Sequence, residues 1–297
     1  SYITLVRPVG WTPFLFPLLF GLIDAGFQSL KLVYLMSLIC GPLLAGGIYT
    51  LNFYYDIEAD KKSDVVKDIV MAEQPFITGK VGRLEGLLLA GVLITLGLSL
   101  AWVINKTVLS LGVLAVIIGI IYSFPPRLKD VPFGDVAVNS IVAALCYLVG
   151  WSTFKDIGDV TIYPILWILL LIAATYLLTV VIDIEVDRRA ELKTTAIHLG
   201  LERAITLSFY IYLLSFALYV LTLVISLKLS YLLIMPLLMM GLFNYQNLLK
   251  EKNPAKAYRL AKRATITCAA TIMILLLIYS LVSLLGLTDE KIFSFIW

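Results

Sequence analysis

Nine long runs of apolar residues divide this chain of 297 residues. A helix needs about 20 apolar residues to cross ~30 Å of hydrocarbon, so each run predicts a transmembrane helix. The sequence therefore indicates an all-α membrane protein with nine transmembrane helices. The runs are Trp11–Gly26, Leu32–Tyr55, Leu84–Ile104, Thr107–Phe124, Val131–Phe154, Ile162–Ile182, Ala204–Leu227, Leu229–Leu248 and Ala264–Leu287.

Composition excludes the main alternatives. Hydrophobic residues make up 61% of the chain and charged residues only 14%, whereas soluble domains carry about 25% charged residues. A water-soluble globule, a disordered protein and a nucleic-acid-binding protein are all excluded on this ground. Cys40, Cys146 and Cys268 lie in apolar runs without metal-like spacing, so we interpret them as small buried hydrophobic residues.

The placement of the basic residues predicts the orientation. With nine spans, 18 of the 23 Lys and Arg fall on the side of the N-terminus, and this side is therefore expected to be cytoplasmic. The long connections Asp56–Arg83 and Asp183–Arg203 lie on the same side. We expect an integral protein of a prokaryotic cell membrane, with its N-terminus and the mouth of its site in the cytoplasm.

The chain is expected to form one transmembrane domain in which two four-helix halves are followed by a ninth helix. Residues 1–126 form the first half, residues 127–250 the second, and residues 251–297 contain the last helix. Each half carries one polar motif at the cytoplasmic end of a predicted helix.

The two motifs are rows of oxygen-bearing side chains. Asn52, Asp56 and Asp60 follow one another at steps of four at the end of the second run, and Asp183, Asp187 and Glu191 do so after the sixth. A step of four in a helix returns to nearly the same face after ~6 Å, so each triplet predicts a stripe of oxygen donors. Either motif alone can be read as a solvated helix end.

Two such stripes on one membrane side favour a shared site. Acidic groups beside a membrane are costly and mark function by default, and facing carboxylates repel one another unless cations lie between them. Mg²⁺ prefers oxygen ligands and is commonly held by a few carboxylates together with substrate phosphates. The sequence therefore predicts a Mg²⁺–diphosphate site whose metal ligands are Asn52, Asp56, Asp60, Asp183 and Asp187.

Basic residues with the complementary chemistry lie near both motifs. The segment Tyr122–Lys129 ends a predicted helix at a double proline and brings Arg127 and Lys129 to the cytoplasmic mouth. Cations there would stabilise a departing diphosphate, and the same role is predicted for Arg7, Lys80 and Lys193. The alternative is the general excess of basic residues on the cytoplasmic side.

At these residues the chain resembles the UbiA superfamily of intramembrane prenyltransferases. The similarity spans nearly the whole chain and is carried by Leu5–Pro8, Asn52–Asp60, Gln74–Lys80, Tyr122–Lys129 and Asp183–Thr194. It implies nine helices around a central cavity, aspartate motifs on helices two and six that hold Mg²⁺ and diphosphate, and a lateral route for lipids. Two positions depart from the family pattern: Phe53 stands where a second acid is common, and Gln74 where Arg is common.

This resemblance leads to a functional hypothesis. The protein is expected to transfer a prenyl group from an allylic polyprenyl diphosphate to a lipophilic acceptor, which can be an aromatic ring precursor or a glycerol ether lipid. Mg²⁺ is the cofactor. Lys129, supported by Arg127 and Lys193, would stabilise the diphosphate, while Tyr122 would face the cation-like prenyl fragment. The lipid bilayer is the expected partner, with no nucleic acid and no obligate protein partner.

Other functions remain open at this point. Paired intramembrane acids and proline-broken helices also occur in transporters, although these stripes lie at a membrane surface. A prenyl diphosphate hydrolase or cyclase would share the ionisation step. His198, the only histidine, is interpreted as incidental. The connection Lys61–Thr78 is either a closing lid or a plain surface loop.

Overall fold

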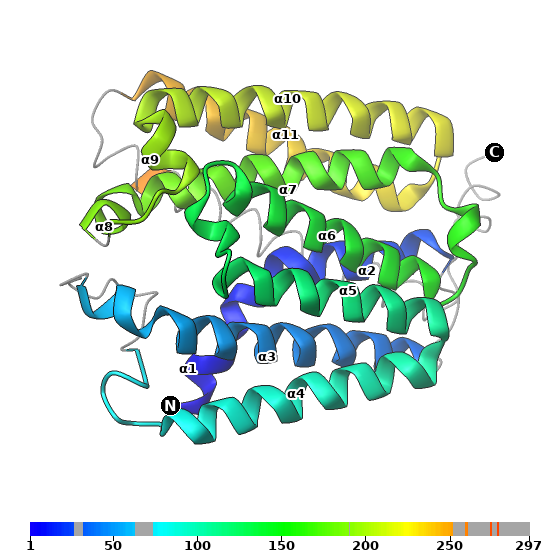
Figure 1. The fold of residues 1–297 in the computed structure, drawn as a ribbon. Helices are drawn as coiled ribbons and strands as arrows, with labels where there is room; N and C mark the ends of the chain where they lie inside the picture. The colour runs from blue at the N-terminus through cyan, green and yellow to red at the C-terminus, as the bar shows by residue number, and fades with distance from the viewer. Residues whose placement is uncertain are drawn as a thin grey trace.

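A computed structural model describes residues 1–26, 32–62, 74–189 and 191–251, and the single positions 259, 260, 274 and 278. These residues form helices joined by short connections, with no strand among them. Most of the helices run side by side in one bundle (Figure 1). The elements are α1 (Tyr2–Val6), η1 (Pro8–Trp11), α2 (Thr12–Asp24), α3 (Leu32–Lys62), α4 (Arg83–Ile104), α5 (Lys106–Ser123), η2 (Leu128–Asp130), α6 (Gly134–Ser152), η3 (Ile157–Asp159), α7 (Ile162–Ile182), α8 (Ile184–Arg189), α9 (Thr195–Leu199), α10 (Leu201–Ser226) and α11 (Leu229–Lys250).

Seven helical segments in the described part of the chain are long and apolar enough to cross a membrane. They correspond to the first seven predicted runs, which confirms the all-α membrane class. They are Tyr2–Asp24, Leu32–Glu58, Arg83–Ile104, Lys106–Ser123, Gly134–Ser152, Ile162–Val181 and Leu201–Ser226. The eighth predicted run coincides with α11, which is helical but is not among these seven. The ninth lies outside the described residues except for Ile274 and Ile278.

The first span begins earlier than the sequence suggested. The predicted run started at Trp11, but α1 already begins at Tyr2. The two parts are separated because Arg7 adopts a left-handed conformation with φ 49° and Pro8 then starts η1. In Figure 1, α1 runs across the direction of the bundle while α2 follows it. Arg7 is thereby placed at the junction, near the end of α3 that carries the first motif.

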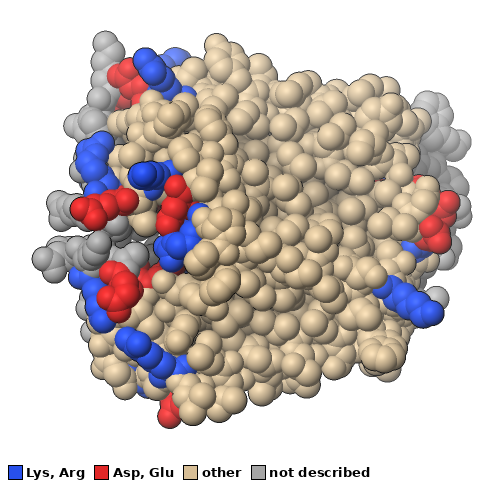
Figure 2. All heavy atoms as spheres, viewed as in Figure 1, with Lys and Arg blue, Asp and Glu red and all other residues tan. Residues whose placement is uncertain are grey.

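Charged side chains gather at the two ends of the molecule. On the face shown in Figure 2, a wide band without Lys, Arg, Asp or Glu separates these ends. Such a band matches a bilayer interior, because charged residues in hydrocarbon are costly. The end that holds α8, α9 and the close of α3 carries most of the charges visible on this face.

Three hydrophobic clusters form the core of the described residues, and α2 and α6 contribute to both of the larger ones. These two helices approach until their backbones touch. A Cβ added at Gly21 would lie 2.1 Å from the carbonyl oxygen of Tyr147, and one added at Gly150 would lie 2.2 Å from that of Leu18. Only glycine fits at either position, and small residues of this kind allow close packing of membrane helices.

An ion pair with a buried carboxylate joins helices at the end of the bundle opposite the aspartate motifs. Asp24, only 3% exposed, closes α2 and accepts hydrogen bonds from the hydroxyls of Tyr147 (2.7 Å) and Tyr231 (3.0 Å). The Lys228 ammonium lies 2.6 Å from the Asp24 carboxylate and 2.8 Å from its carbonyl oxygen. Through Asp24, α2 is joined to α6 and to the α10–α11 turn.

Candidate active site

The first motif lies on the last turns of α3, as predicted. Asn52, Asp56 and Asp60 are all partly buried. The side-chain oxygen of Asn52 is buried and has no hydrogen-bond partner among the described residues. A buried oxygen without a partner is costly, and a cation is one way to satisfy it.

The second motif differs from the predicted continuous stripe. Helix α7 ends at Ile182, Asp183 lies in the turn that follows, and Asp187 belongs to the short helix α8. The spacing of one turn is nevertheless kept, because the Asp187 amide donates to the Asp183 carbonyl at 2.8 Å. Glu191 leaves the row, since it follows the end of α8 and has a left-handed φ of 58°. The expectation that all three acids share one helix face is therefore wrong for Glu191.

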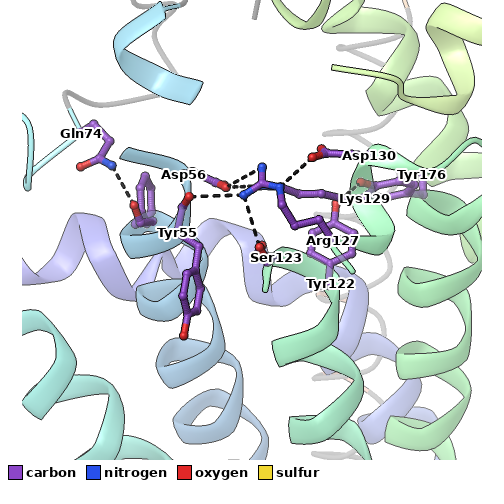
Figure 3. Close-up of polar contacts among 10 residues, drawn as sticks. Tyr55, Asp56, Gln74, Tyr122, Ser123, Arg127, Lys129, Asp130 and Tyr176 are labelled. Atoms are coloured by element: carbon purple, nitrogen blue, oxygen red, sulfur yellow. Dashed lines mark hydrogen bonds and ion pairs between the residues drawn. The ribbon is translucent and has the colours of Figure 1, made fainter. Parts of the chain in front are cut away.

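A cationic connection joins α5 to α6 and reaches the first motif (Figure 3). Arg127 is left-handed with φ 54° and precedes η2. Its guanidinium donates to Asp130 at 2.7 Å and to the carbonyls of Tyr55 and Ser123, each at 3.3 Å. It also lies 3.6 Å from Asp56, with which Lys129 forms a shorter ion pair. The structure therefore brings Arg127 and Lys129 to Asp56.

Lys129 acts electrostatically on both motifs. Burial raises the pKa of Asp60 to about 6, with Asp56 adding to the shift, and a hydrogen bond from Gln74 and the charges of Lys129 and Arg7 oppose it. Burial likewise raises the pKa of Asp187 to about 7, with Asp183 adding to the shift, and Lys129 again opposes it. The ammonium is therefore in contact with Asp56 of the first motif and favours the charged form of Asp187 in the second.

The remaining predicted cations are placed differently. The Arg7 guanidinium lies over the ring of Tyr49, 5.6 Å from its centroid, and acts on Asp60 as noted above. Lys80 and Lys193 are both exposed. His198 is also exposed on α9, where its ring meets Phe133 edge to face at 6.1 Å.

Tyrosine side chains lie on the membrane side of the carboxylates. The hydroxyls of Tyr122 on α5 and Tyr176 on α7 are 2.7 Å apart, and Figure 3 shows both beside the cationic connection. Tyr49 precedes Asp56 by seven residues, and Tyr176 precedes Asp183 by the same number. Seven residues are about two helical turns, or ~10 Å, so these tyrosines form a layer beneath the two motifs.

Gln74 supports the first motif from the following connection. Its amide nitrogen donates to the carbonyl of Phe53 at 2.8 Å, and its oxygen accepts from the amide of Phe76 at 2.9 Å. It also hydrogen-bonds Asp60. Where the family commonly has Arg, this chain therefore uses a neutral side chain that is occupied by protein groups. The predicted lid, Lys61–Thr78, lies mostly outside the described residues, since positions 63–73 are not described.

Sequence reasoning missed three polar residues near the site. Asp130 directly follows Lys129 and binds Arg127; its position within the cationic segment was the available signal. Asp135 is 1% exposed and binds Thr195, 60 residues away, through both the backbone amide and the hydroxyl. No local pattern reveals a contact of that range. Tyr176 could have been found from its seven-residue step to Asp183.

The donor chemistry of the site fits Mg²⁺. Among the described residues, no three Asp, Glu, His or Cys side chains converge closely enough to hold a metal ion by themselves. Mg²⁺ rarely uses such a cage and is commonly bound by one or two carboxylates plus substrate phosphates. The raised pKa values of Asp60 and Asp187 and the unpartnered oxygen of Asn52 leave the site short of positive charge. Both observations agree with metal ions that arrive together with a polyanionic substrate.

Fold and site together define a helical membrane protein with paired acidic motifs and a cationic connection at one membrane surface. A sequence match to the UbiA prenyltransferase family covers residues 14–267, and the chain belongs to this family.

Two curated relatives and one solved structure illustrate the similarity. The chain is 32% identical over 180 residues to digeranylgeranylglyceryl phosphate synthase of Thermococcus kodakarensis, a match that covers 60% of this chain and 61% of the relative. It is 27% identical over 222 residues to 4-hydroxybenzoate octaprenyltransferase of Polynucleobacter asymbioticus, covering 70% and 72%. The structure of a UbiA homolog from Archaeoglobus fulgidus bound to GPP and Mg²⁺ superposes with a TM-score of 0.75 at 26% identity, covering 93% of this chain and 99% of that one.

Proposed function

We propose that this protein transfers a prenyl group from an allylic polyprenyl diphosphate to a lipophilic acceptor within the membrane, in a Mg²⁺-dependent reaction. Family membership and the names of the relatives support prenyl transfer. The similar structure that was solved with GPP and Mg²⁺ supports a diphosphate donor and this metal. We further propose that residues 1–297 act as one domain, with an acidic motif from each half, and that the site opens to the cytoplasm.

The observation that carries the proposal is the position of Lys129. Its ammonium pairs with Asp56 and acts on both Asp60 and Asp187. A cation at the first acidic row that also favours the charged form of Asp187 supports a place there for a diphosphate and its metal ions. A solvated helix end would not require a buried lysine, and the side chain of Lys129 is only 12% exposed.

We assign the metal-binding role to the carboxylates of Asp56, Asp60, Asp183 and Asp187 and to the amide oxygen of Asn52. When bound, Mg²⁺ would neutralise the charge that develops on the leaving diphosphate. For this role the two motifs must present unprotonated oxygens, and Lys129 favours that state at Asp60 and Asp187.

The basic side chains of the site are proposed to hold the diphosphate and to stabilise its departure. Lys129 and Arg127 would exchange their contacts with Asp56 for phosphate oxygens as the substrate arrives, and Asp130 would keep Arg127 oriented meanwhile. Arg7 is placed to act at the close of α3. Lys80 and Lys193, both exposed, would contribute from the rim.

The tyrosine layer is proposed to face the prenyl fragment. When the carbon–oxygen bond breaks, the allylic carbon gains positive charge, which aromatic faces stabilise by about 0.5–2 kcal/mol. Tyr122 and Tyr176 meet beside the cationic connection, and an apolar chain that extends from the diphosphate into the bundle would pass them. Their hydroxyls are hydrogen-bonded to each other, which leaves the ring faces to contact the chain.

Pyrophosphate release tests the proposal against its alternatives. Purified protein with geranylgeranyl diphosphate and Mg²⁺ is expected to release pyrophosphate in the presence of a phenolic or glycerol-phosphate acceptor, and mass analysis should find the prenylated acceptor. Release with only prenyl alcohol or cyclic hydrocarbon as product would support a hydrolase or cyclase. No release with any acceptor, together with ion or solute flux in vesicles, would support a transporter.

A further inference from the structure

A buried acid outside the two motifs links the start of α6 to the start of α9. The carboxylate of Asp135 accepts a hydrogen bond from the Thr195 amide at 3.0 Å and a second, shorter one from the Thr195 hydroxyl. The same hydroxyl accepts from the amide of Phe133 at 2.6 Å. Asp135 is 1% exposed and Thr195 is fully buried. The three residues therefore form a buried polar link.

This link continues into the second motif. Thr194, adjacent to Thr195, donates its hydroxyl hydrogen to the Asp187 carboxylate at 3.1 Å. Thr194 is 7% exposed, so its side chain is held by packing as well as by this bond. A hydrogen bond fixes the direction in which Asp187 presents its oxygens, and Asp135 fixes the segment that supplies the bond.

The other end of the link lies against the cationic connection. Gly134 packs so closely on η2 that a Cβ there would lie 2.4 Å from the carbonyl oxygen of Leu128. Leu128 immediately precedes Lys129, the residue that pairs with Asp56. The short segment 133–135 thus contacts Leu128, which precedes Lys129, and Thr195, which follows the residue that binds Asp187.

We propose that Asp135 is a positioning residue that acts through Thr195 and Thr194 to hold Asp187 at a fixed place relative to Lys129 and Asp56. The inference rests on the proposed function, because it assigns the link a purpose in bringing the two motifs onto one metal–diphosphate group. Asp135 itself is directed at protein groups and touches no substrate. Loss of such outer contacts typically weakens metal binding or activity about 10–100-fold.

Thr195→Val removes the hydroxyl of the link while keeping the side-chain volume nearly unchanged. The matched control is Thr222→Val, which makes the same change at a buried threonine. Thr222 lies near the end of α10 that is farther from α9. Thr195→Ser restores the hydroxyl. The readouts are Mn²⁺ binding with inorganic pyrophosphate, followed by electron paramagnetic resonance, the thermal midpoint without metal, and pyrophosphate release from geranylgeranyl diphosphate.

Thr195→Val is expected to weaken Mn²⁺ binding at least about tenfold, to raise the Mg²⁺ concentration needed for half-maximal turnover by a similar factor, and to be rescued by Thr195→Ser. Thr222→Val should leave both quantities near the wild-type values at a comparable thermal midpoint. Equal metal binding in the two valine variants would overturn the positioning role alone. Wild-type protein that neither binds Mn²⁺ nor releases pyrophosphate would overturn the proposed function and this inference with it.

Discussion

Lys129 of η2 forms an ion pair with Asp56 of α3, although the two residues are 73 positions apart in the sequence. The ammonium is partly buried and lies within electrostatic reach of the second motif as well. One side chain therefore pairs with the first acidic row and acts electrostatically on the second.

Replacing this lysine should impair turnover far more than folding. Lys129→Met is expected to lower Mg²⁺-dependent pyrophosphate release about 100-fold, because the site loses a cation placed where negative charge develops. Arg127 remains 3.6 Å from Asp56 and limits the loss of stability. Initial rates and thermal midpoints of the variant should be compared with those of Lys106→Met, at the opposite end of α5. Turnover within twofold of wild type would contradict a role in diphosphate departure.

The carboxylates can be tested in the same assay. Asp56→Ala and Asp187→Ala are each expected to lower turnover about 100-fold or more, since each removes a proposed metal ligand. Glu58→Ala serves as the control on α3, because the Glu58 side chain is 78% exposed and pairs with nearby Lys61. Circular dichroism should show all three variants folded. Substantial activity in either aspartate variant would show that the two motifs do not act together.

The stability of the metal-free protein should fall as pH rises. The folded-state pKa values of Asp60 and Asp187, about 6 and about 7, exceed the ordinary value of 3.8. The folded protein therefore binds more protons than the unfolded chain. The stabilisation that comes from these protonated carboxyls is fully present below the unfolded-state pKa of 3.8, and it is lost as pH rises through the two folded-state pKa values.

Thermal midpoints between about pH 5 and pH 8 test this sign. Their decline should be smaller in the double variant Asp60→Asn, Asp187→Asn, which cannot acquire the two charges. Added Mg²⁺ should raise the wild-type midpoint more at the higher pH, because ligands must be deprotonated to bind metal. An identical pH profile in both proteins would refute the assignment of the effect to these carboxyls.

The Lys228–Asp24 ion pair, at the end of the bundle opposite the aspartate motifs, is expected to contribute to stability and not to turnover. Lys228→Met leaves the Asp24 carboxylate, 4% exposed, without its cation, and is expected to lower the free energy of unfolding by about 3 kcal/mol. Lys61→Met breaks an exposed pair and should cost no more than about 1 kcal/mol. Reversible unfolding in detergent measures both values. Adding Asp24→Asn to Lys228→Met should recover part of the loss, and a further decrease would contradict a charge-based cause.

The parts of the site that the sequence predicts are those set by local geometry. Asn52, Asp56 and Asp60 lie on an uninterrupted helix, so a step of four was enough to place them on one face. The same rule failed beyond Asp187, because α7 ends at Ile182 and Glu191 enters a left-handed turn. The membrane spans were predictable for a related reason, since the apolar length required is fixed by the bilayer.

Contacts between residues far apart in the chain could not be predicted from the sequence. Asp135 has an ordinary acidic position after a glycine, and nothing nearby indicates that it binds Thr195 across 60 residues. In the sequence Gln74 is only a departure from the family pattern, whereas in the fold its amide binds the backbone of Phe53 and Phe76. These contacts depend on how helices far apart in the chain come together, which periodicity does not encode.

The mutual contact at Gly21 and Gly150 has a mechanical meaning. Where the two backbones touch, no side chain lies between them that could rearrange. Helices α2 and α6 must therefore move together as one rigid pair. Under the proposed function, any widening of the bundle that admits a prenyl chain would therefore occur by tilting of the other helices around this pair.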